Sequence, residues 1–262
     1  MTDQSLYLRK EIPLAWIVVN RPEMRNAISL EMWQTLPGLV KKVAEDNTLR
    51  VLIIRGAGED AFISGADISQ FEKVRFGVEA GEYDQAVSKA LSDLIDLEKP
   101  VIAMIHGFCI GGGCSVAMMC DLRLAADDAR FSIPAAHLGI VYSLERGAER
   151  LVSLVGPANA SEILFTGRSY DAQEAYHMGL INRVIPKTKL ENYTREYALK
   201  ISSKAPLSLA AHKASIQELL KPPSQRNFER LKNLADCCFA SEDYKEGMAA
   251  FMEKRKPKFQ GK

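Results

Sequence analysis

The chain carries, from residue 106 to residue 121, the stretch His106-Gly-Phe-Cys-Ile-Gly-Gly-Gly-Cys-Ser-Val-Ala-Met-Met-Cys-Asp121. It follows Val101-Ile-Ala-Met-Ile105, a short apolar run that predicts a buried strand. The residues from Cys114 to Met119 are mostly small or unbranched and favour a helix, so the predicted order is strand, glycine turn, helix. Glycines allow a ligand to come close to the main chain, and the first N–H groups of the helix would face that ligand. The stretch therefore predicts either a site for an oxyanion or a polarised carbonyl group, or a tight turn without a ligand.

A chain of 262 residues is long enough to bury a large core, as one domain or as one domain with a small extension. Apolar residues make up 47% of it and charged residues 26%, which is typical of a soluble globular protein. The formal net charge of +1 gives no electrostatic reason to expect nucleic acid or an acidic membrane as a partner. No apolar run approaches the roughly 20 residues of a membrane span, and residues 1–10 are too polar for a signal peptide. We therefore expect a cytoplasmic protein that binds neither nucleic acid nor membrane.

The cysteine pattern predicts neither a disulfide nor a metal site. The five cysteines form no CxxC pair and lie near no histidine cluster. We expect all of them to be reduced, buried thiols of a cytosolic protein. They are Cys109, Cys114, Cys120, Cys237 and Cys238.

Strands and helices alternate in the first half of the chain, which predicts an α/β core. Ser29 is a suitable N-cap for the first helix. The run Val51-Leu-Ile-Ile54 is apolar without interruption, as expected for a strand in a sheet covered on both faces. Strands are predicted at 15–19, 51–54, 101–105, 122–126 and 130–133, and helices at 29–43 and 84–97.

Beyond Ala158 the sequence favours helices, interrupted by a short strand predicted at 180–184 and by prolines. The last helix is predicted to begin after Ser241, whose hydroxyl can cap it. Basic residues at 254–256 suit its negative end, and Pro257 is expected to stop it.

The loop from Arg55 to Ile68 contains a second turn, Ser64-Gly-Ala-Asp67, that can also present backbone N–H groups. The stretch 71–83 that follows has weak periodicity and several charges, and we expect it to form a flap over the site.

Together, these motifs resemble those of the crotonase superfamily, the enoyl-CoA hydratase/isomerase group, from about Ala15 to Phe259. Each motif is weak by itself, but seven of them in the order of the family are a specific signal. They are Asn20-Arg-Pro-Glu-Met-Arg-Asn-Ala27, Phe62-Ile-Ser-Gly-Ala-Asp-Ile68, His106-Gly-Phe-Cys-Ile-Gly-Gly-Gly113, Cys120-Asp121, Leu164-Phe-Thr-Gly167, Ala175-Tyr-His-Met-Gly-Leu180 and Gly247-Met-Ala-Ala-Phe-Met-Glu-Lys254.

The resemblance implies an α/β fold, a spiral of repeated ββα units over residues 1–200. It also implies a C-terminal helical region over residues 201–262 that forms trimers, which pair into hexamers. The implied ligand is an acyl-CoA thioester. Coenzyme A is then part of the substrate, so neither a separate cofactor nor a metal is expected.

By position, the resemblance places the backbone N–H groups of Ala66 and Gly112 in an oxyanion hole for the thioester carbonyl. Two donors aimed at the place where negative charge develops would stabilise a thioester enolate, the intermediate shared by most of the superfamily.

The resemblance also implies contacts with coenzyme A from the first part of the chain. Asp67 and Ile68, beside Ala66, would lie by the adenine, with Arg25 and Ala27 near the phosphates. The alternative is that Arg25 and Asp67 are ordinary surface charges.

Two residues of the last helix, Phe251 and Lys254, match positions that reach coenzyme A, often across subunits. The alternatives are that Lys254 is a solvated charge and that Phe251 packs in a core, since Met248 and Met252 are apolar neighbours on the helix.

The sequence departs from the family where hydratases carry two glutamates for general acid–base catalysis. The first position is Ser115 and the second is Ala135. Neither side chain can act as an acid or a base near neutral pH, so two-glutamate hydration is not expected. The loop that follows offers Tyr142 as a hydrogen-bond donor and Glu145 as an acid or base.

The alternative is that Glu145 pairs with Arg146 or Arg150 on the surface and that Tyr142 only packs. His137, in the same loop, is more typical of a structural turn than of a catalytic group. Cys114 and Ser115 follow a helix start, as nucleophiles can, but no motif places a histidine base beside them.

Three functions are compatible with these residues. The first is an acyl-CoA enzyme of the crotonase type that stabilises a thioester enolate. The second is decarboxylation or hydrolysis of a branched or carboxylated acyl-CoA, because Leu138-Gly-Ile-Val-Tyr142 resembles a loop of methylmalonyl-CoA decarboxylases. Those enzymes carry a histidine at the position of Ala66 and a glutamate at that of Ser115, so this likeness is partial. The third is a non-catalytic acyl-CoA-binding partner of another enzyme.

Overall fold

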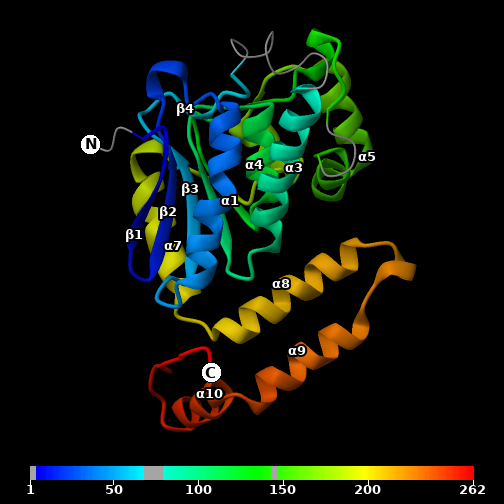
Figure 1. Ribbon diagram of the computed structural model, residues 1–262. Helices are drawn as coiled ribbons and strands as arrows, with labels where there is room; N and C mark the ends of the chain where they lie inside the picture. The colour runs from blue at the N-terminus through cyan, green and yellow to red at the C-terminus, as the bar shows by residue number, and fades with distance from the viewer. Residues whose placement is uncertain (1–3, 68–78, 143–146) are drawn as a thin grey trace.

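A six-stranded sheet forms the centre of the computed structural model, which describes residues 4–67, 79–142 and 147–262 (Figure 1). Its strand order is β1-β2-β3-β5-β7-β10; β1 and β2 are antiparallel, and the other neighbours are parallel. The strands are β1 (Leu6–Glu11), β2 (Leu14–Val19), β3 (Val51–Gly56), β5 (Val101–Ile105), β7 (Leu122–Ala126) and β10 (Arg183–Ile185).

A second sheet has the order β4-β6-β8-β9, and its first three strands are parallel. β4, β6 and β8 directly follow β3, β5 and β7 of the large sheet, and each pair of strands leads into a helix. The described chain therefore repeats a ββα unit three times, and the predicted spiral fold is confirmed. The elements are β4 (Ala61–Ile63), β6 (Phe108–Ile110), β8 (Arg130–Ser132), β9 (Tyr170–Asp171), α3 (Glu79–Asp96), α4 (Gly112–Met119) and α5 (Glu149–Thr166).

Helices cover both faces of the large sheet, as the apolar run of β3 predicted (Figure 1). Leu52 and Ile54 pack in the core under α1 (Leu30–Glu45), α3 and α4, whereas Val51 and Ile53 pack in a second core under α7 (Leu190–Ser202). Ser29 caps α1 as predicted, since its Oγ accepts a hydrogen bond of 3.3 Å from the Met32 N–H.

One strand was missed, and the predicted bounds of some elements were wrong. β1 was missed because its sequence is half charged, and only its pairing with β2 makes it a strand. The strand expected at 180–184 is Arg183–Ile185, because the N–H groups of Leu180 and Ile181 donate to the Ala175 carbonyl and close the end of α6 (Ala172–His177). α3 begins at Glu79, ahead of the expected start at residue 84.

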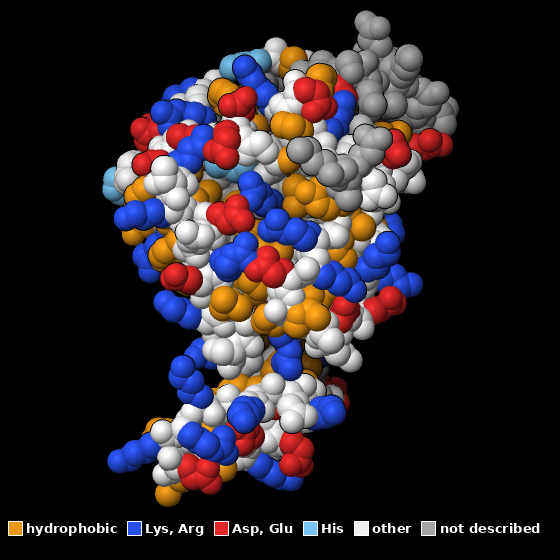
Figure 2. Space-filling model, turned by 90° about the vertical axis from the view of Figure 1, so that its left-hand side faces the viewer, with side chains coloured by type: hydrophobic (Ala, Val, Ile, Leu, Met, Phe, Trp, Pro, Cys, Tyr) orange, Lys and Arg blue, Asp and Glu red, His pale blue; other side chains and the backbone are white. Residues whose placement is uncertain are grey.

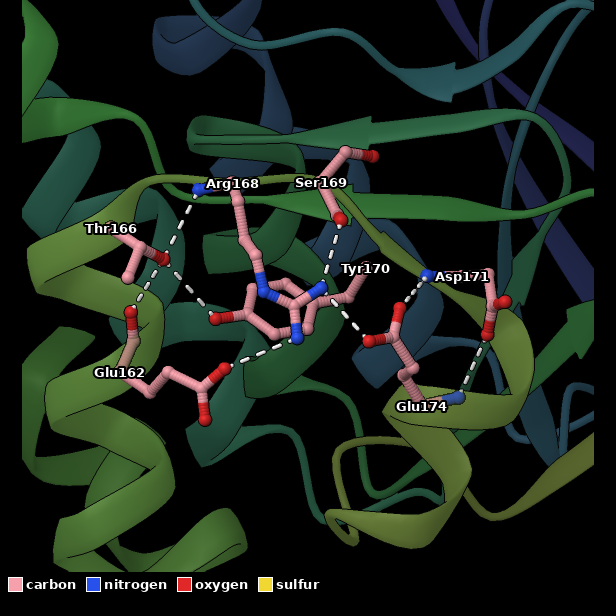
Figure 3. Close-up of polar contacts among 7 residues, drawn as sticks. All are labelled: Glu162, Thr166, Arg168, Ser169, Tyr170, Asp171 and Glu174. Carbon is pink, nitrogen blue, oxygen red and sulfur yellow. Dashed lines mark hydrogen bonds and ion pairs between the residues drawn. The ribbon is translucent and has the colours of Figure 1, made fainter.

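The junction of α5, β9 and α6 is held by one arginine (Figure 3). The Arg168 guanidinium pairs with Glu162 of α5 at 3.1 Å and with Glu174 of α6 at 2.8 Å, and it lies 3.7 Å from the centre of the Tyr170 ring. Asp171 and Glu174 form a reciprocal capping box at the start of α6. This cluster fixes Gly167, the residue that ends α5, beside the candidate site described below.

The last three helices, α8 (Pro206–Leu220), α9 (Phe228–Ala240) and α10 (Glu242–Met252), form an arm that extends away from the sheets (Figure 1). Polar contacts join α8 to the body: Lys213 Nζ lies 2.9 Å from Asp121 Oδ2, and Gln217 donates to the Ile95 carbonyl at 2.6 Å. The arm is the narrow lower part of Figure 2, and acidic and basic side chains are interspersed on the face shown. The domain boundary expected at residues 200–201 falls in the last turn of α7.

α10 ends at Met252, earlier than the predicted stop at Pro257. Lys254 has a φ of +54°, its N–H donates to the Phe251 carbonyl, and the Arg255 N–H donates to the Ala250 carbonyl. These two bonds and the left-handed residue form a Schellman motif, which closes the helix before the basic residues.

The prediction that all five cysteines are buried was wrong for α9. Cys109, Cys114 and Cys120 are buried, but Cys237 is exposed and Cys238 is half-buried, because α9 lies on the arm. In the described parts of the chain, no helix is both long and apolar enough to cross a membrane.

Candidate active site

The first glycine turn begins α4 and is fixed against the second sheet. Gly111 has a φ of +50°, and its N–H donates to the Ser132 carbonyl of β8 at 2.8 Å. A β-carbon on Gly113 would lie 2.2 Å from the Ile63 carbonyl oxygen of β4, so only glycine fits there. Gly112, between them, is the first residue of α4, where a backbone N–H has no partner within the helix.

The second turn, Ser64 to Asp67, follows β4 and is held by the segment 25–28. Ser64 N–H donates to the Arg25 carbonyl at 3.1 Å. Ile28 brackets Ala66: its N–H donates to the Gly65 carbonyl, and its carbonyl accepts from the Asp67 N–H, both at 2.9 Å. In this bridge, the N–H of Ala66 is directed away from Ile28.

The two turns meet at the N-terminus of α4. The amide nitrogen of Ala66 lies 3.7 Å from the position that a β-carbon would take on Gly112. No hydrogen bond joins either N–H, of Ala66 or of Gly112, to another residue in the described part of the chain. The structure thus brings close together the two turns whose backbone N–H groups the resemblance predicted as partners.

Asn26, which is buried and was not among the predicted site residues, supports the frame of the site, that is, the two turns and the segments that hold them. Its amide group donates to the carbonyls of Ala57 and Ala61 at 2.8 and 2.7 Å, and its Oδ1 accepts from the Arg21 N–H at 3.0 Å. Both Arg25 and Asn26 have left-handed backbones, with φ of +48° and +59°. Asparagine tolerates that conformation, and its place after a proline turn was the available sequence signal.

The predicted coenzyme A residues of the first part of the chain lie around these turns. The Asp67 carboxylate is buried and pairs with Arg21 at 2.9 Å, so its side chain braces the turn. The Arg25 guanidinium lies 5.1 Å from the centre of the Phe108 ring, a cation–π contact that positions it beside β6. Ala27 is buried beside the same turn.

One turn further along α4 from Gly112, Ser115 contacts Tyr142. The two hydroxyl oxygens are 2.7 Å apart, and the Ser115 hydroxyl also lies 3.4 Å from the Gly111 carbonyl oxygen. A β-carbon on Gly147 would come within 2.6 Å of the Tyr142 ring, so glycine leaves room for it. Burial raises the pKa of Tyr142 well above its usual value, so the phenol stays neutral at physiological pH.

The loop that leads to Tyr142 is anchored at its start. His137 Nε2 lies 3.1 Å from the Thr166 carbonyl oxygen, and a β-carbon on Gly167 would be 2.9 Å from the same ring atom. This contact gives His137 a structural role. Ala135 begins the short helical turn Ala135–Leu138, and its methyl side chain cannot act as an acid or a base. Glu145, Ile68 and most of the expected flap at 71–83 lie outside the described residues.

The buried cysteines have no features of a nucleophile. The Cys114 thiol donates to the Cys109 carbonyl at 3.0 Å, and burial raises the pKa of Cys109 well above its usual value. In the described chain, no cluster of three or more histidine, cysteine or acidic side chains has the arrangement of a metal site.

Phe251 and Lys254 are not brought to this site within one chain. α10 lies at the far end of the arm, while α4 lies in the body (Figure 1). Phe251 is 79% exposed.

Comparison with known proteins identifies one family and relatives that match nearly the whole chain. The family described as enoyl-CoA hydratase/isomerase matches residues 9–262. The chain is 37% identical to a crotonyl-CoA hydratase of Syntrophomonas wolfei over 259 residues, which cover 99% of each chain. It is 35% identical to a short-chain-enoyl-CoA hydratase of Clostridium acetobutylicum over 252 residues, 96% of each.

Among solved structures, an enoyl-CoA hydratase/isomerase family protein, described as putative, from Hyphomonas neptunium superimposes with a TM-score of 0.93 at 39% identity, covering 98% of this chain and 97% of that one. An enoyl-CoA hydratase/carnithine racemase from Magnetospirillum magneticum superimposes with a TM-score of 0.92 at 36% identity, covering 100% and 97%.

Proposed function

The chain belongs to the enoyl-CoA hydratase/isomerase family, and we propose that it processes an acyl-CoA thioester by stabilising an enolate or oxyanion with the N–H groups of Ala66 and Gly112. The observation that carries the proposal is the meeting of the two turns. The Ala66 nitrogen lies 3.7 Å from the position of a β-carbon on Gly112, and neither N–H group has a hydrogen-bond partner among the described residues. The positive end of the α4 dipole adds to the field at this point. One such donor contributes roughly 3 kcal/mol to lowering the barrier.

Coenzyme A would bind along the rim made by Arg25 and Ala27, with its adenine near Asp67 and Ile68. Because Asp67 is buried against Arg21, we assign its contribution to the backbone of the turn. Phe251 and Lys254 would complete the site from a neighbouring copy in a homotrimer or a homohexamer. Exposure of the Phe251 ring on the arm supports this arrangement. We place the protein in the cytoplasm.

The acid–base chemistry would differ from that of a two-glutamate hydratase. Ser115 and Ala135 supply no carboxylate, so we expect weak hydration of crotonyl-CoA, the substrate in the name of one relative. Tyr142 would donate a hydrogen bond to the acyl group, and Glu145 would move the proton.

A second candidate function is decarboxylation or hydrolysis of a carboxylated or branched acyl-CoA. The neutral phenol of Tyr142 favours it, because its hydroxyl group can donate a hydrogen bond to a substrate carboxylate. In decarboxylation, the electrons of the broken C–C bond would form the thioester enolate, which Ala66 and Gly112 would stabilise until a proton reaches the α-carbon.

The test is a mass-spectrometric screen of purified protein against a panel of acyl-CoA thioesters: enoyl, 3-hydroxyacyl, 3-oxoacyl, malonyl and branched malonyl. Each reaction class predicts its own product. Hydration or dehydration changes the mass by that of water, about 18 units, and decarboxylation lowers it by that of carbon dioxide, about 44 units. Hydrolysis releases free coenzyme A. Tight binding without turnover of any thioester would support the third function, a non-catalytic acyl-CoA-binding partner. Absence of binding to every thioester would overturn the proposal.

A further inference from the structure

Two arginines lie at the end of α4 that is opposite Gly112. Arg150 Nε donates to the Met118 carbonyl at 2.9 Å, and Arg123 donates through a terminal nitrogen to the Cys120 carbonyl at 2.7 Å. Backbone carbonyls at this end of a helix have no partner within it, so both side chains cap α4. In the described part of the chain, neither guanidinium forms an ion pair with a carboxylate.

A cation in this position would be costly without nearby negative charge. Arg123 is buried and Arg150 is half-buried. Burial lowers the pKa of both guanidiniums, that of Arg123 to about 10, so both remain charged at physiological pH. The negative end of the α4 dipole faces them and supplies part of the opposite charge.

The same charges act on the other end of the helix. α4 spans eight residues, Gly112–Met119, so its two ends lie about 12 Å apart. All its residues after Gly112 are buried, and charges separated by buried protein are screened much less than exposed ones. Without the arginines, the negative end would offset part of the positive potential at Gly112. With them the negative end is neutralised, and the potential at Gly112 is more positive.

We propose that Arg150, together with Arg123, is a positioning residue that acts through α4: its positive charge increases the stabilisation of a negatively charged oxygen at Gly112. The inference rests on the proposed function, because it takes the thioester oxyanion to be bound at that end of the helix. Arg150 would touch neither the substrate nor the reacting atoms. Its charge would matter in addition to its hydrogen bond.

The experiment uses acetoacetyl-CoA as the probe, because its enolate carries the negative charge that the site would stabilise. The enolate absorbs ultraviolet light more strongly than the neutral thioester, so a pH titration with excess protein gives the pKa of the bound ligand. Calorimetry with butyryl-CoA, which stays neutral, measures ordinary thioester binding. Mass spectrometry of the same samples accounts for any turnover.

Two substitutions separate the charge of Arg150 from its hydrogen bond. Arg150→Gln removes the charge and retains an amide donor for the Met118 carbonyl, whereas Arg150→Lys retains the charge. Arg150 is chosen because Arg123 also holds the Leu180 carbonyl, at 2.7 Å, and its replacement would disturb a second segment.

Arg226→Gln is the matched control. Arg226 donates to the carbonyls of Leu219 and Lys221 at 2.9 and 3.0 Å, and therefore caps the end of α8 in the same way. α8 begins at Pro206, away from the candidate site.

Asp121 allows a test of opposite sign. It follows α4 and acts electrostatically on both arginines, and its Oδ2 accepts from Lys213 Nζ at 2.9 Å and from the Val101 N–H at 2.7 Å. Asp121→Asn removes the negative charge and keeps an acceptor for the Val101 N–H. Structural damage alone would weaken the stabilisation of the enolate, whereas the loss of a negative charge should strengthen it.

We expect the wild-type protein to lower the pKa of acetoacetyl-CoA on binding. Arg150→Gln should raise the pKa of the bound thioester by about one unit, a tenfold change in the enolate equilibrium, as for a unit charge about 12 Å away at an effective dielectric constant of about 20. Asp121→Asn should lower it by up to about the same amount. Arg150→Lys and Arg226→Gln should leave it within about 0.3 units, and all variants should bind neutral butyryl-CoA within about twofold of the wild-type affinity.

The inference is overturned if Arg150→Gln leaves the pKa of the bound thioester unchanged, or if Arg150→Lys raises it equally. It is also overturned if Asp121→Asn fails to lower this pKa, and that variant decides the matter if circular dichroism shows that Arg150→Gln does not fold. A wild-type protein that does not bind acetoacetyl-CoA, or binds it without lowering its pKa, would contradict the proposed function itself. A wild-type shift that does not respond to charge would contradict only the inference.

Discussion

One side of the candidate site consists of backbone groups, and the other consists of side chains. On one side, Ala66 and Gly112 contribute backbone N–H groups, and bonds from Ile28 and from β8 fix the turns that carry them. On the other side, the Tyr142 side chain stands at the end of a loop and contacts Ser115 through a single hydrogen bond. Backbone geometry survives many side-chain replacements, whereas a side chain on a loop changes with one substitution. The contrast suggests that the frame preserves the common thioester chemistry while the loop determines the reaction.

Removing a backbone donor should have the largest effect. Gly112→Pro deletes the N–H at the first position of α4, where proline fits a helix. We expect kcat/KM on whichever thioester the screen identifies to fall by about 100- to 1,000-fold, as for other oxyanion donors. Steady-state kinetics measures the loss, with circular dichroism as a check on folding.

Glu242→Pro is the matched control, because Glu242 is the first residue of α10 and follows Ser241, whose extended backbone suits a residue before proline. It should leave kcat/KM within about twofold, since no oxyanion donor is lost. Equal losses in the two variants would show that the backbone side has no special role.

The rigidity of the frame should depend on Asn26. Asn26→Ala removes three hydrogen bonds, leaves the carbonyls of Ala57 and Ala61 without this donor, and puts alanine in a left-handed conformation. We expect the free energy of unfolding to fall by about 2–4 kcal/mol in urea titrations. Asn227→Ala, which removes one capping bond to the Arg230 N–H, should cost about 1 kcal/mol. Similar costs for the two variants would mean that Asn26 does not brace the turns.

Much of the frame could be predicted from sequence because glycines and apolar runs act locally. The strand, turn and helix around Gly111 were predictable, since a positive φ at Gly111 and the absence of space at Gly113 both require glycine. The bracing of Asp67 by Arg21 could not be predicted, because the two residues are far apart in sequence and only the fold makes them neighbours. The same holds for Ser115 and Tyr142: each was singled out, yet nothing in the sequence says that their hydroxyls meet.

The loop side should gain an activity when carboxylates are supplied. Ser115→Glu combined with Ala135→Glu introduces carboxylates at the two positions where the resemblance implies acid–base groups, and it leaves the two backbone turns unchanged. We expect crotonyl-CoA hydration, measured as the loss of enoyl absorbance, to rise about 100-fold, the low end for general acid–base catalysis. The double glutamine variant has the same size without the charge and should show no rise. A rise with glutamine, or none with glutamate, would mean that the loop side does not limit hydration.

A further expected effect concerns the far end of α4, where Cys120 is buried and its Sγ contacts the Val116 carbonyl at 3.3 Å. Burial raises the pKa of Cys120 from its usual value of 9.0 to about 12. Because the folded pKa is above the unfolded one, the stabilising contribution is fully present below pH 9 and is lost as the pH rises towards 12. Over that window, one proton held only by the folded state gives a slope of about 1.4 kcal/mol per pH unit.

Urea unfolding should be measured between about pH 8.5 and 10.5, a range that begins at roughly the unfolded thiol pKa. Over this range, the free energy of unfolding should fall less steeply with pH in Cys120→Ala than in the wild-type protein. Cys237→Ala is the control, because its thiol on α9 is exposed in the folded chain. Equal slopes for all three proteins would mean that solvent reaches the end of α4. The buried helix would then be less rigid than its backbone contacts indicate. In that case α4 could not be treated as a fixed support for the Gly112 turn, in contrast to the variable loop.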